Sequence, residues 1–94
     1  MTFTDIKQSS YFTTLALKKH YIEIMSMNTF HTWKIDISDG CYDLFHSHSI
    51  FQNYHYQTSF GNLDDLTRYI KEHDIYQLRG RKNQRIPVYA LNLT

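Results

Sequence analysis

The clearest pattern in the chain is a strict alternation of apolar and polar positions on both sides of Asp39 and Gly40. Apolar side chains at every second position are typical of a strand that buries one face. An Asp-Gly pair between two such runs favours a two-residue type I′ turn, in which both central residues adopt positive φ. The pattern therefore predicts an antiparallel hairpin formed by residues 33–38 and 41–46.

A two-residue turn also fixes the register of this hairpin, because Ser38 must then face Cys41 and each earlier residue must face its counterpart. In this register Asp36 lies directly opposite Asp43. The face predicted to point into the core carries Trp33, Ile35, Ile37, Tyr42 and Leu44. The opposite, outward face is predicted to carry Lys34, Asp36, Asp43 and Phe45.

Helical spacing of apolar residues predicts a helix over residues 63–76. The apolar stripe of this helix consists of Leu63, Leu66, Tyr69, Ile70, His73 and Tyr76. Asn62 precedes it as a favourable N-cap, and Asp64 and Asp65 stand in the first turn, where the helix dipole stabilises negative charge. Pattern, cap and charge agree, so this is the most clearly predicted helix in the chain.

The N-terminal part carries conflicting signals. Residues 10–14 combine aromatic and β-branched side chains, which favour a strand. Residues 15–19 read Leu-Ala-Leu-Lys-Lys, which favours a helix with apolar positions at helical spacing. We expect one helix over about residues 5–19, followed by a strand at 21–25.

Alternation and loop residues predict the remaining elements. A loop at 49–53 precedes a strand at 54–60, and a polar, basic connection at 77–85 leads to a last strand at 86–93. The expected fold is α+β, a small single domain over residues 1–94 in the order α-β-β-β-β-α-β. It consists of an antiparallel sheet of about 4–5 strands with two helices on one face.

Composition is that of an ordinary globular protein. Of the 94 residues, 41% are hydrophobic and 20% are charged, and the formal net charge is +1. These values argue against a disordered chain and against attraction to membranes or nucleic acid by net charge. No apolar run is long enough for a membrane helix, and the single cysteine, Cys41, leaves no internal disulfide. With first residues unlike a secretion signal, the chain is expected to be cytoplasmic.

The hairpin register also predicts a group of histidines. If strand pairing continues past Trp33 and His46, His31 faces His48, and both lie beside His46 at the open end of the hairpin. Three neutral imidazoles from two strands are a donor set that binds zinc. Polar residues that simply mark the edge of the core produce the same pattern. We therefore expect no cofactor or metal, and hold His31, His46 and His48 only as candidate ligands.

A basic segment precedes the last predicted strand. Arg79, Arg81, Lys82 and Arg85 fall within seven residues that also include Gly, Asn and Gln, a composition suited to phosphate contacts. Basic residues ahead of a final strand resemble those of small bacterial ribosome-dependent RNases of toxin–antitoxin systems. Those proteins place their helices before most of the sheet, whereas here the clearest helix follows four predicted strands. The resemblance implies an alternative function in nucleic-acid or ribosome binding. In the extreme case it implies the activity of a toxin-like RNase.

Acidic residues gather in the middle of the chain, where no Lys or Arg occurs between Ile35 and Thr67. Asp36 and Asp43 face each other across the hairpin, and like charges so placed cost about 0.2–1 kcal/mol. Such a conflict is typical of a surface shaped for a basic partner. The predicted partner-binding residues are Asp36, Asp39, Asp43, Phe45, Asp64 and Asp65.

The chain shows no catalytic constellation: Cys41 has no base near it in sequence, and no glycine-rich phosphate loop occurs. We expect a small non-enzymatic binding or inhibitor protein, a nucleic-acid mimic whose acidic and aromatic surface covers a protein or ribonucleoprotein partner. Residues with AT-rich codons outnumber those with GC-rich codons, which indicates an AT-rich genome. We therefore expect a phage or mobile-element accessory, such as an anti-CRISPR or other anti-defence inhibitor, or an immunity-type protein, in the host cytoplasm.

Overall fold

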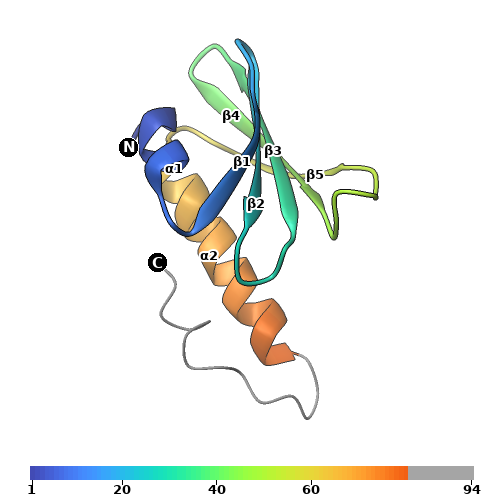
Figure 1. Ribbon diagram of the computed structural model, residues 1–94. Helices are drawn as coiled ribbons and strands as arrows, with labels where there is room; N and C mark the ends of the chain where they lie inside the picture. The colour runs from blue at the N-terminus through green and yellow to red at the C-terminus, as the bar shows by residue number, and fades with distance from the viewer. Residues whose placement is uncertain (81–94) are drawn as a thin grey trace.

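Five strands in chain order form one antiparallel sheet, in which each strand pairs with its neighbours in the sequence (Figure 1). The computed structural model describes residues 1–80 of the 94-residue chain. The elements are α1 (Phe3–Gln8), β1 (Phe12–Leu17), β2 (Tyr21–Ser26), β3 (Thr32–Ser38), β4 (Cys41–Ser47), β5 (His55–Phe60) and α2 (Leu63–Gly80). This arrangement confirms the predicted small α+β fold with an antiparallel sheet and two helices.

The hairpin of β3 and β4 has the predicted register. Ser38 faces Cys41 and Asp36 faces Asp43, and the pairing continues without a shift along the hairpin. The central turn residues Asp39 and Gly40 have φ values of 46° and 75°, as a type I′ turn requires. Because side chains alternate between the two faces of a strand, this register decides which residues point toward the helices.

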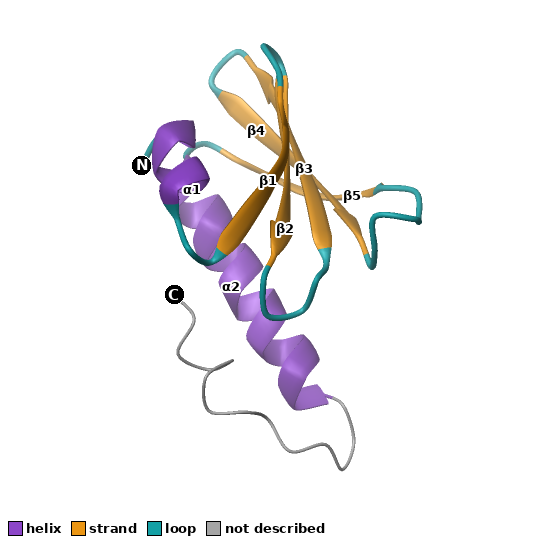
Figure 2. Ribbon diagram, in the orientation of Figure 1, coloured by secondary structure: helices purple, strands orange, loops and turns teal. Residues whose placement is uncertain are grey.

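The core lies between one face of the sheet and the two helices, which lie on the same side of it (Figure 2). The central strands supply five completely buried side chains: Ile22, Ile24, Trp33, Ile35 and Leu44. α2 packs against them with residues at helical spacing: Leu63, Leu66 and Ile70. Ile37 and Tyr42, also predicted to face the core, are only half-buried at its edge, where Tyr42 packs against Phe3 of α1.

The helix predicted over about residues 5–19 is wrong. α1 ends at Gln8, where Ser9 leaves the helix with an extended backbone. Residues 12–17 form β1, which pairs with β2 at the edge of the sheet. The helix propensity of residues 15–17 is a local preference of a few tenths of a kcal/mol each, and pairing with β2 overrides it. The aromatic and β-branched residues at the start of β1 gave the correct signal.

α2 is longer than predicted. It continues to Gly80, so residues 77–80, predicted as the start of a basic connection, are helical. The rest of that connection and the strand predicted at 86–93 lie outside the described residues. Over residues 1–80 the element order is α-β-β-β-β-β-α, with β1 in place of most of the predicted first helix.

Candidate functional site

Five of the six histidines in the chain gather around one ring, that of His46. His46 lies near the end of β4, with His48 just beyond that strand. His31 precedes β3, His55 begins β5, and His73 lies on α2. The centroids of these four rings lie between 4.8 and 5.4 Å from the centroid of the His46 ring. We call these five residues the histidine cluster.

Strand register and helix spacing explain how the cluster forms. His46 is two residues after the buried Leu44 and therefore points to the same, helix-facing side of β4. A register shift in the β4–β5 ladder next to Leu44 brings His55 opposite His46. His73 continues the apolar stripe of α2 and therefore faces the sheet. The centroid of its ring lies 5.0 Å from the centroid of the Trp33 ring.

The three rings predicted to converge do lie together: the centroids of His31, His46 and His48 are 4.9 to 5.0 Å apart. The hairpin pattern did not include His73 or His55. The place of His73 on the apolar stripe of the predicted helix was an available signal, because that stripe has to face the sheet. His55 joins through the register shift in β5, which the sequence pattern does not reveal.

The ring nitrogens converge most closely in three of these residues. Nε2 of His46 lies 3.0 Å from Nδ1 of His31, within hydrogen-bond distance. One ring nitrogen from each of His31, His46 and His73 lies within 4.8 Å of the other two. The side chains of His31 and His46 are buried, and His73 is half-buried. Nδ1 of His73 is itself buried and has no hydrogen-bond partner within residues 1–80.

Burial keeps His46 in its neutral form. Burial, and after it the charges of His73, His31, His48 and His55, lower the pKa of His46 from 6.5 to about 3. A neutral imidazole keeps a lone pair on one ring nitrogen, which accepts a hydrogen bond or binds a metal ion. At neutral pH the interior beside α2 therefore contains at least one imidazole lone pair.

A buried carboxylate lies next to the histidine cluster. Asp74 follows His73 on α2 and is completely buried. It accepts hydrogen bonds from the hydroxyl of Tyr11 at 2.5 Å and from that of Thr29 at 3.1 Å. Burial, and next the hydrogen bond to Asp74, raise the pKa of the Tyr11 hydroxyl far above its usual value.

The hairpin pattern did not include Asp74 either. Oδ1 of this carboxylate lies 3.9 Å from Nδ1 of His73. The residues that Asp74 contacts, Tyr11 and Thr29, are far from it in the chain, so no local pattern brings them together. Its position directly after His73 was the one local signal.

The acids predicted to bind a partner are divided between the two sides of the sheet. Asp36 and Asp43 face each other on the side away from the helices, and Asp39 is exposed in the turn between their strands. Asp64 and Asp65 begin α2, on the helix side. The structure therefore brings together the three acids of the hairpin and separates them from the two acids of α2.

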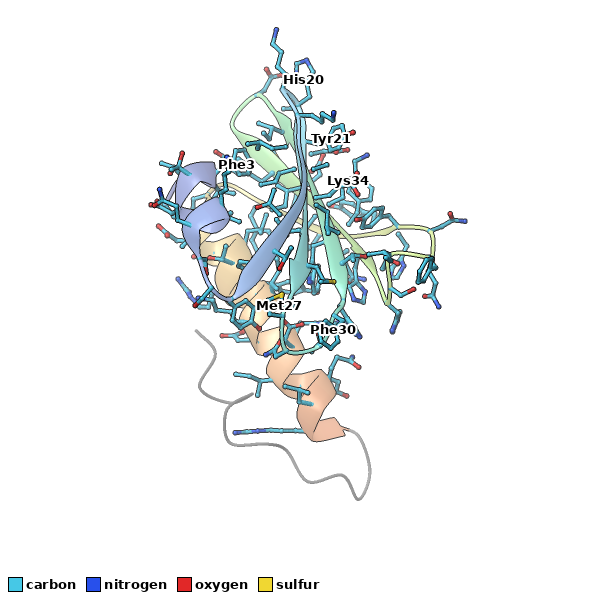
Figure 3. The ribbon with its side chains drawn as sticks, in the orientation of Figure 1. Phe3, His20, Tyr21, Met27, Phe30 and Lys34 are labelled. Atoms are coloured by element: carbon cyan, nitrogen blue, oxygen red, sulfur yellow. The ribbon has the colours of Figure 1, made fainter. Side chains whose placement is uncertain are left out.

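The side of the sheet away from the helices carries charged and aromatic side chains together. Lys34 lies at its centre, with Nζ 3.5 Å from Oδ1 of Asp36 and 4.9 Å from the ring centroid of Tyr21. In Figure 3, Tyr21 and Lys34 lie on the opposite side of the sheet from Phe3 of α1. We call this surface the open sheet face, and define it by Tyr21, Lys34, Asp36, Asp43, Phe45 and Tyr56.

Phe45, predicted to point outward, lies on this face and is half-buried. Its ring centroid is 5.7 Å from that of Tyr56, whose side chain is 56% exposed. Ser59 donates a hydrogen bond to Asp43 at 2.5 Å and shares a second one, at 2.6 Å, with the hydroxyl of Tyr56. The acid and the two aromatic rings therefore form one connected patch.

The residues predicted to bind nucleic acid lie mostly outside the described part of the chain. The structure describes only Arg79, which is exposed in the last turn of α2. Arg81, Lys82 and Arg85 follow beyond residue 80. Binding of nucleic acid through this segment stays a prediction.

Residues 1–80 contain no helix that is both long and apolar enough to cross a membrane. No pocket is found in the same residues. Comparison of the chain with family models, with curated proteins and with solved structures finds no match.

Proposed function

We propose that this chain is a small binding protein that covers a basic surface of a protein or ribonucleoprotein partner with its open sheet face. The observation that carries the proposal is the direct pairing of Asp36 with Asp43 on that face. Carboxylates placed opposite each other cost about 0.2–1 kcal/mol of stability. A cost of this kind on a surface that neither helix covers is typical of a site shaped for a partner of opposite charge.

The local contact of Asp36 leaves its charge accessible. The side chains of Lys34 and Asp36 are 31% and 38% exposed, so solvent screens their ion pair. An exposed pair of this kind contributes at most about 1 kcal/mol. With Asp39 in the adjoining turn and Glu23 opposite Lys34, four acids lie on or beside this face. Lys18 and Lys19 are exposed in the β1–β2 turn at the same end of the sheet. The proposal therefore rests on the local pairing of Asp36 with Asp43, which would attract guanidinium and ammonium groups of a partner, and not on a net charge at that end.

Aromatic side chains supply the apolar contact area that such an interface needs. Phe45 of β4 and Tyr56 of the edge strand β5 pack together on one side of Lys34, and Tyr21 of β2 lies on the other side. Tyrosine is favoured at protein interfaces because it combines a large apolar ring with a hydroxyl that bonds to polar groups. Charge would guide the partner to this face, and the aromatic rings would hold it there.

The proposed action is non-enzymatic inhibition by nucleic-acid mimicry. Carboxylates that occupy a basic groove imitate the phosphates that the groove normally binds. The AT-rich amino-acid usage supports an origin in a phage or mobile element, where such inhibitors act in the host cytoplasm on defence nucleases or toxins. An anti-defence inhibitor, such as an anti-CRISPR, or an immunity-type protein combines these features.

Reversing the two opposed charges tests this proposal. We expect Asp36→Lys with Asp43→Lys to abolish capture of the partner from the native host, because two negative charges become positive, a change of four charge units on the proposed contact surface. The two side chains point away from the core, so the variant is expected to keep its circular dichroism spectrum. The measurement is affinity purification with the wild-type and variant chains as bait, with bound proteins identified by mass spectrometry.

Glu72→Lys is the control, because it reverses an exposed acidic charge on α2, on the helix side of the sheet, at a residue outside the predicted binding surface. We expect this control to retain any partner that the wild-type chain captures. Capture of the same partner by the folded Asp36→Lys, Asp43→Lys variant at wild-type strength would reject the open sheet face as the binding surface.

A further inference from the structure

Three histidines from three separate elements present ring nitrogens to one another in the interior. His31 comes from the loop before β3, His46 from β4 and His73 from α2. The nitrogens of His31 and His46 are 3.0 Å apart, and the group of three lies within 4.8 Å. Tetrahedral zinc, with Zn–N distances near 2.0–2.1 Å, places its nitrogen ligands roughly 3.3 Å apart. Small side-chain rotations are therefore enough to bring the three nitrogens to that spacing.

The donor types select the kind of ion. The three candidate ligands are all imidazoles, which suit zinc and neighbouring transition metals, whereas magnesium and calcium prefer oxygen ligands. Zinc has no strong geometric preference and is bound in proteins by three histidines with a fourth position left open. The exposed His48, whose ring centroid is 4.9 Å from that of His31, is the nearest further imidazole at the rim.

The residues behind the three rings also match a metal site. Histidines that bind zinc commonly direct their other ring nitrogen to a carboxylate, which fixes the orientation of the ring. Asp74 lies 3.9 Å from Nδ1 of His73, a nitrogen that is buried without a hydrogen-bond partner within residues 1–80. Hydrogen bonds from Tyr11 and Thr29 hold this carboxylate in place.

From this arrangement we propose that His31, His46 and His73 bind one Zn²⁺ ion between the sheet and α2, with Asp74 positioning His73. The ion joins β4, the β2–β3 loop and α2, which also meet through side-chain packing and through the hydrogen bond from Thr29 to Asp74. It therefore stabilises the attachment of α2 to the sheet. This role is independent of the open sheet face, which lies on the other side of the sheet.

Zinc titration of the full-length chain tests the proposal directly. The protein is prepared without a polyhistidine tag, stripped with a chelator and titrated with zinc chloride in a calorimeter. We expect one ion per chain, and we expect Co²⁺ in place of zinc to give the strong visible absorption of a tetrahedral site. Failure of the folded wild-type chain to bind zinc with one-to-one stoichiometry would overturn the proposal without any variant.

Single substitutions then assign the ligands. His73→Ala keeps a good helix-forming residue on α2. We expect zinc affinity to fall at least about 100-fold, because loss of a residue that only hydrogen-bonds to a ligand already lowers metal affinity by up to about 100-fold. His20→Ala is the matched control, since His20 is exposed in the β1–β2 turn, at the opposite end of the sheet from Phe30, the residue before His31 (Figure 3). We expect this control to bind zinc with wild-type affinity.

His48→Ala provides a second comparison, with a smaller loss of affinity expected than for His73→Ala. Unchanged zinc affinity in folded His73→Ala, or a larger loss in His48→Ala, would overturn the proposed set of ligands. If His73→Ala does not fold, zinc-induced shifts in the imidazole nitrogen resonances of the wild-type chain decide instead. Shifts at His31, His46 and His73 support the site, and shifts confined to exposed histidines overturn it.

Discussion

Replacing Asp74 with alanine is expected to lower the free energy of unfolding by about 2–5 kcal/mol, because two buried hydroxyl groups lose their acceptor. Tyr11 and Thr29 both donate to this completely buried carboxylate. The three residues come from α2, from the segment just before β1 and from the β2–β3 loop, so their hydrogen bonds hold distant parts of the chain together. For a domain whose total stability is of the order of 5–15 kcal/mol, the loss is severe.

Urea unfolding, followed through circular dichroism and the fluorescence of the single buried Trp33, measures this effect. Glu72→Ala is the control, because Glu72 is an exposed acid on the same helix, and its loss is expected to change stability by less than about 0.5 kcal/mol. Combining Asp74→Ala with Tyr11→Phe should cost less than the sum of the two single changes. Equal stability of Asp74→Ala and Glu72→Ala would contradict the proposed structural role of the carboxylate.

Acidification is expected to destabilise the metal-free protein before its carboxylates titrate. The pKa of His46 is about 3 in the folded chain, against 6.5 for an ordinary histidine, because burial and the neighbouring imidazoles disfavour its charged form. Between these two values the unfolded chain binds one proton that the folded chain does not. The contribution of His46 to the free energy of unfolding is therefore fully present above about pH 6.5. It falls as the pH decreases, by up to about 1.4 kcal/mol per pH unit.

Unfolding experiments at pH 7 and pH 5, with a chelator present, are expected to differ by about 2 kcal/mol through this residue alone. The titratable groups that face His46 are His31, His48 and His55 from the sheet side and His73, with Asp74 behind it, from α2. His46→Leu should remove most of the pH dependence, and the exposed His20→Ala should leave it intact. The same stability at pH 7 and pH 5 in the wild-type chain would show that His46 is not held neutral.

The hairpin was predictable because all of its determinants are local. Alternation of apolar residues and the Asp39-Gly40 turn together fix the pairing of β3 with β4, including the opposition of Asp36 and Asp43. The stripe on α2 was predictable as far as His73 for the same reason, since helical periodicity depends on residues three and four positions apart. Its last predicted member, Tyr76, is 71% exposed, because the helix extends past the sheet there. Where local preferences agree with one another, the sequence pattern and the structure agree.

β1 shows where local preference is insufficient. Residues 15–17 favour a helix by themselves, but their strand pairs with β2 and covers part of the core edge. Hydrogen bonds and packing gained from that neighbour outweigh a small difference in propensity. The decisive contact partner lies in another element, so propensity within the segment could not identify it.

The sequence pattern predicted only the hairpin part of the histidine cluster. Extending the β3–β4 register predicts that His31, His46 and His48 lie together. The other members of the site, His73 and Asp74, lie on α2, which β5 separates from the hairpin in the chain. How α2 crosses the sheet depends on the packing of Leu63, Leu66 and Ile70 against Trp33 and its neighbours. That packing is a property of the whole fold, and no spacing within the sequence encodes it.

Affinity for nucleic acid is the most direct measure of whether the open sheet face, and not the basic segment, carries the function. The full 94-residue chain is titrated into labelled RNA and duplex DNA at physiological salt, with fluorescence anisotropy as the readout. We expect only non-specific binding, with dissociation constants of about 10⁻⁴–10⁻⁶ M, because the acids of the hairpin repel phosphates. Submicromolar affinity, with a salt slope of roughly −2 to −4 that is lost when Arg79, Arg81, Lys82 and Arg85 are replaced by glutamine, would contradict the proposed function.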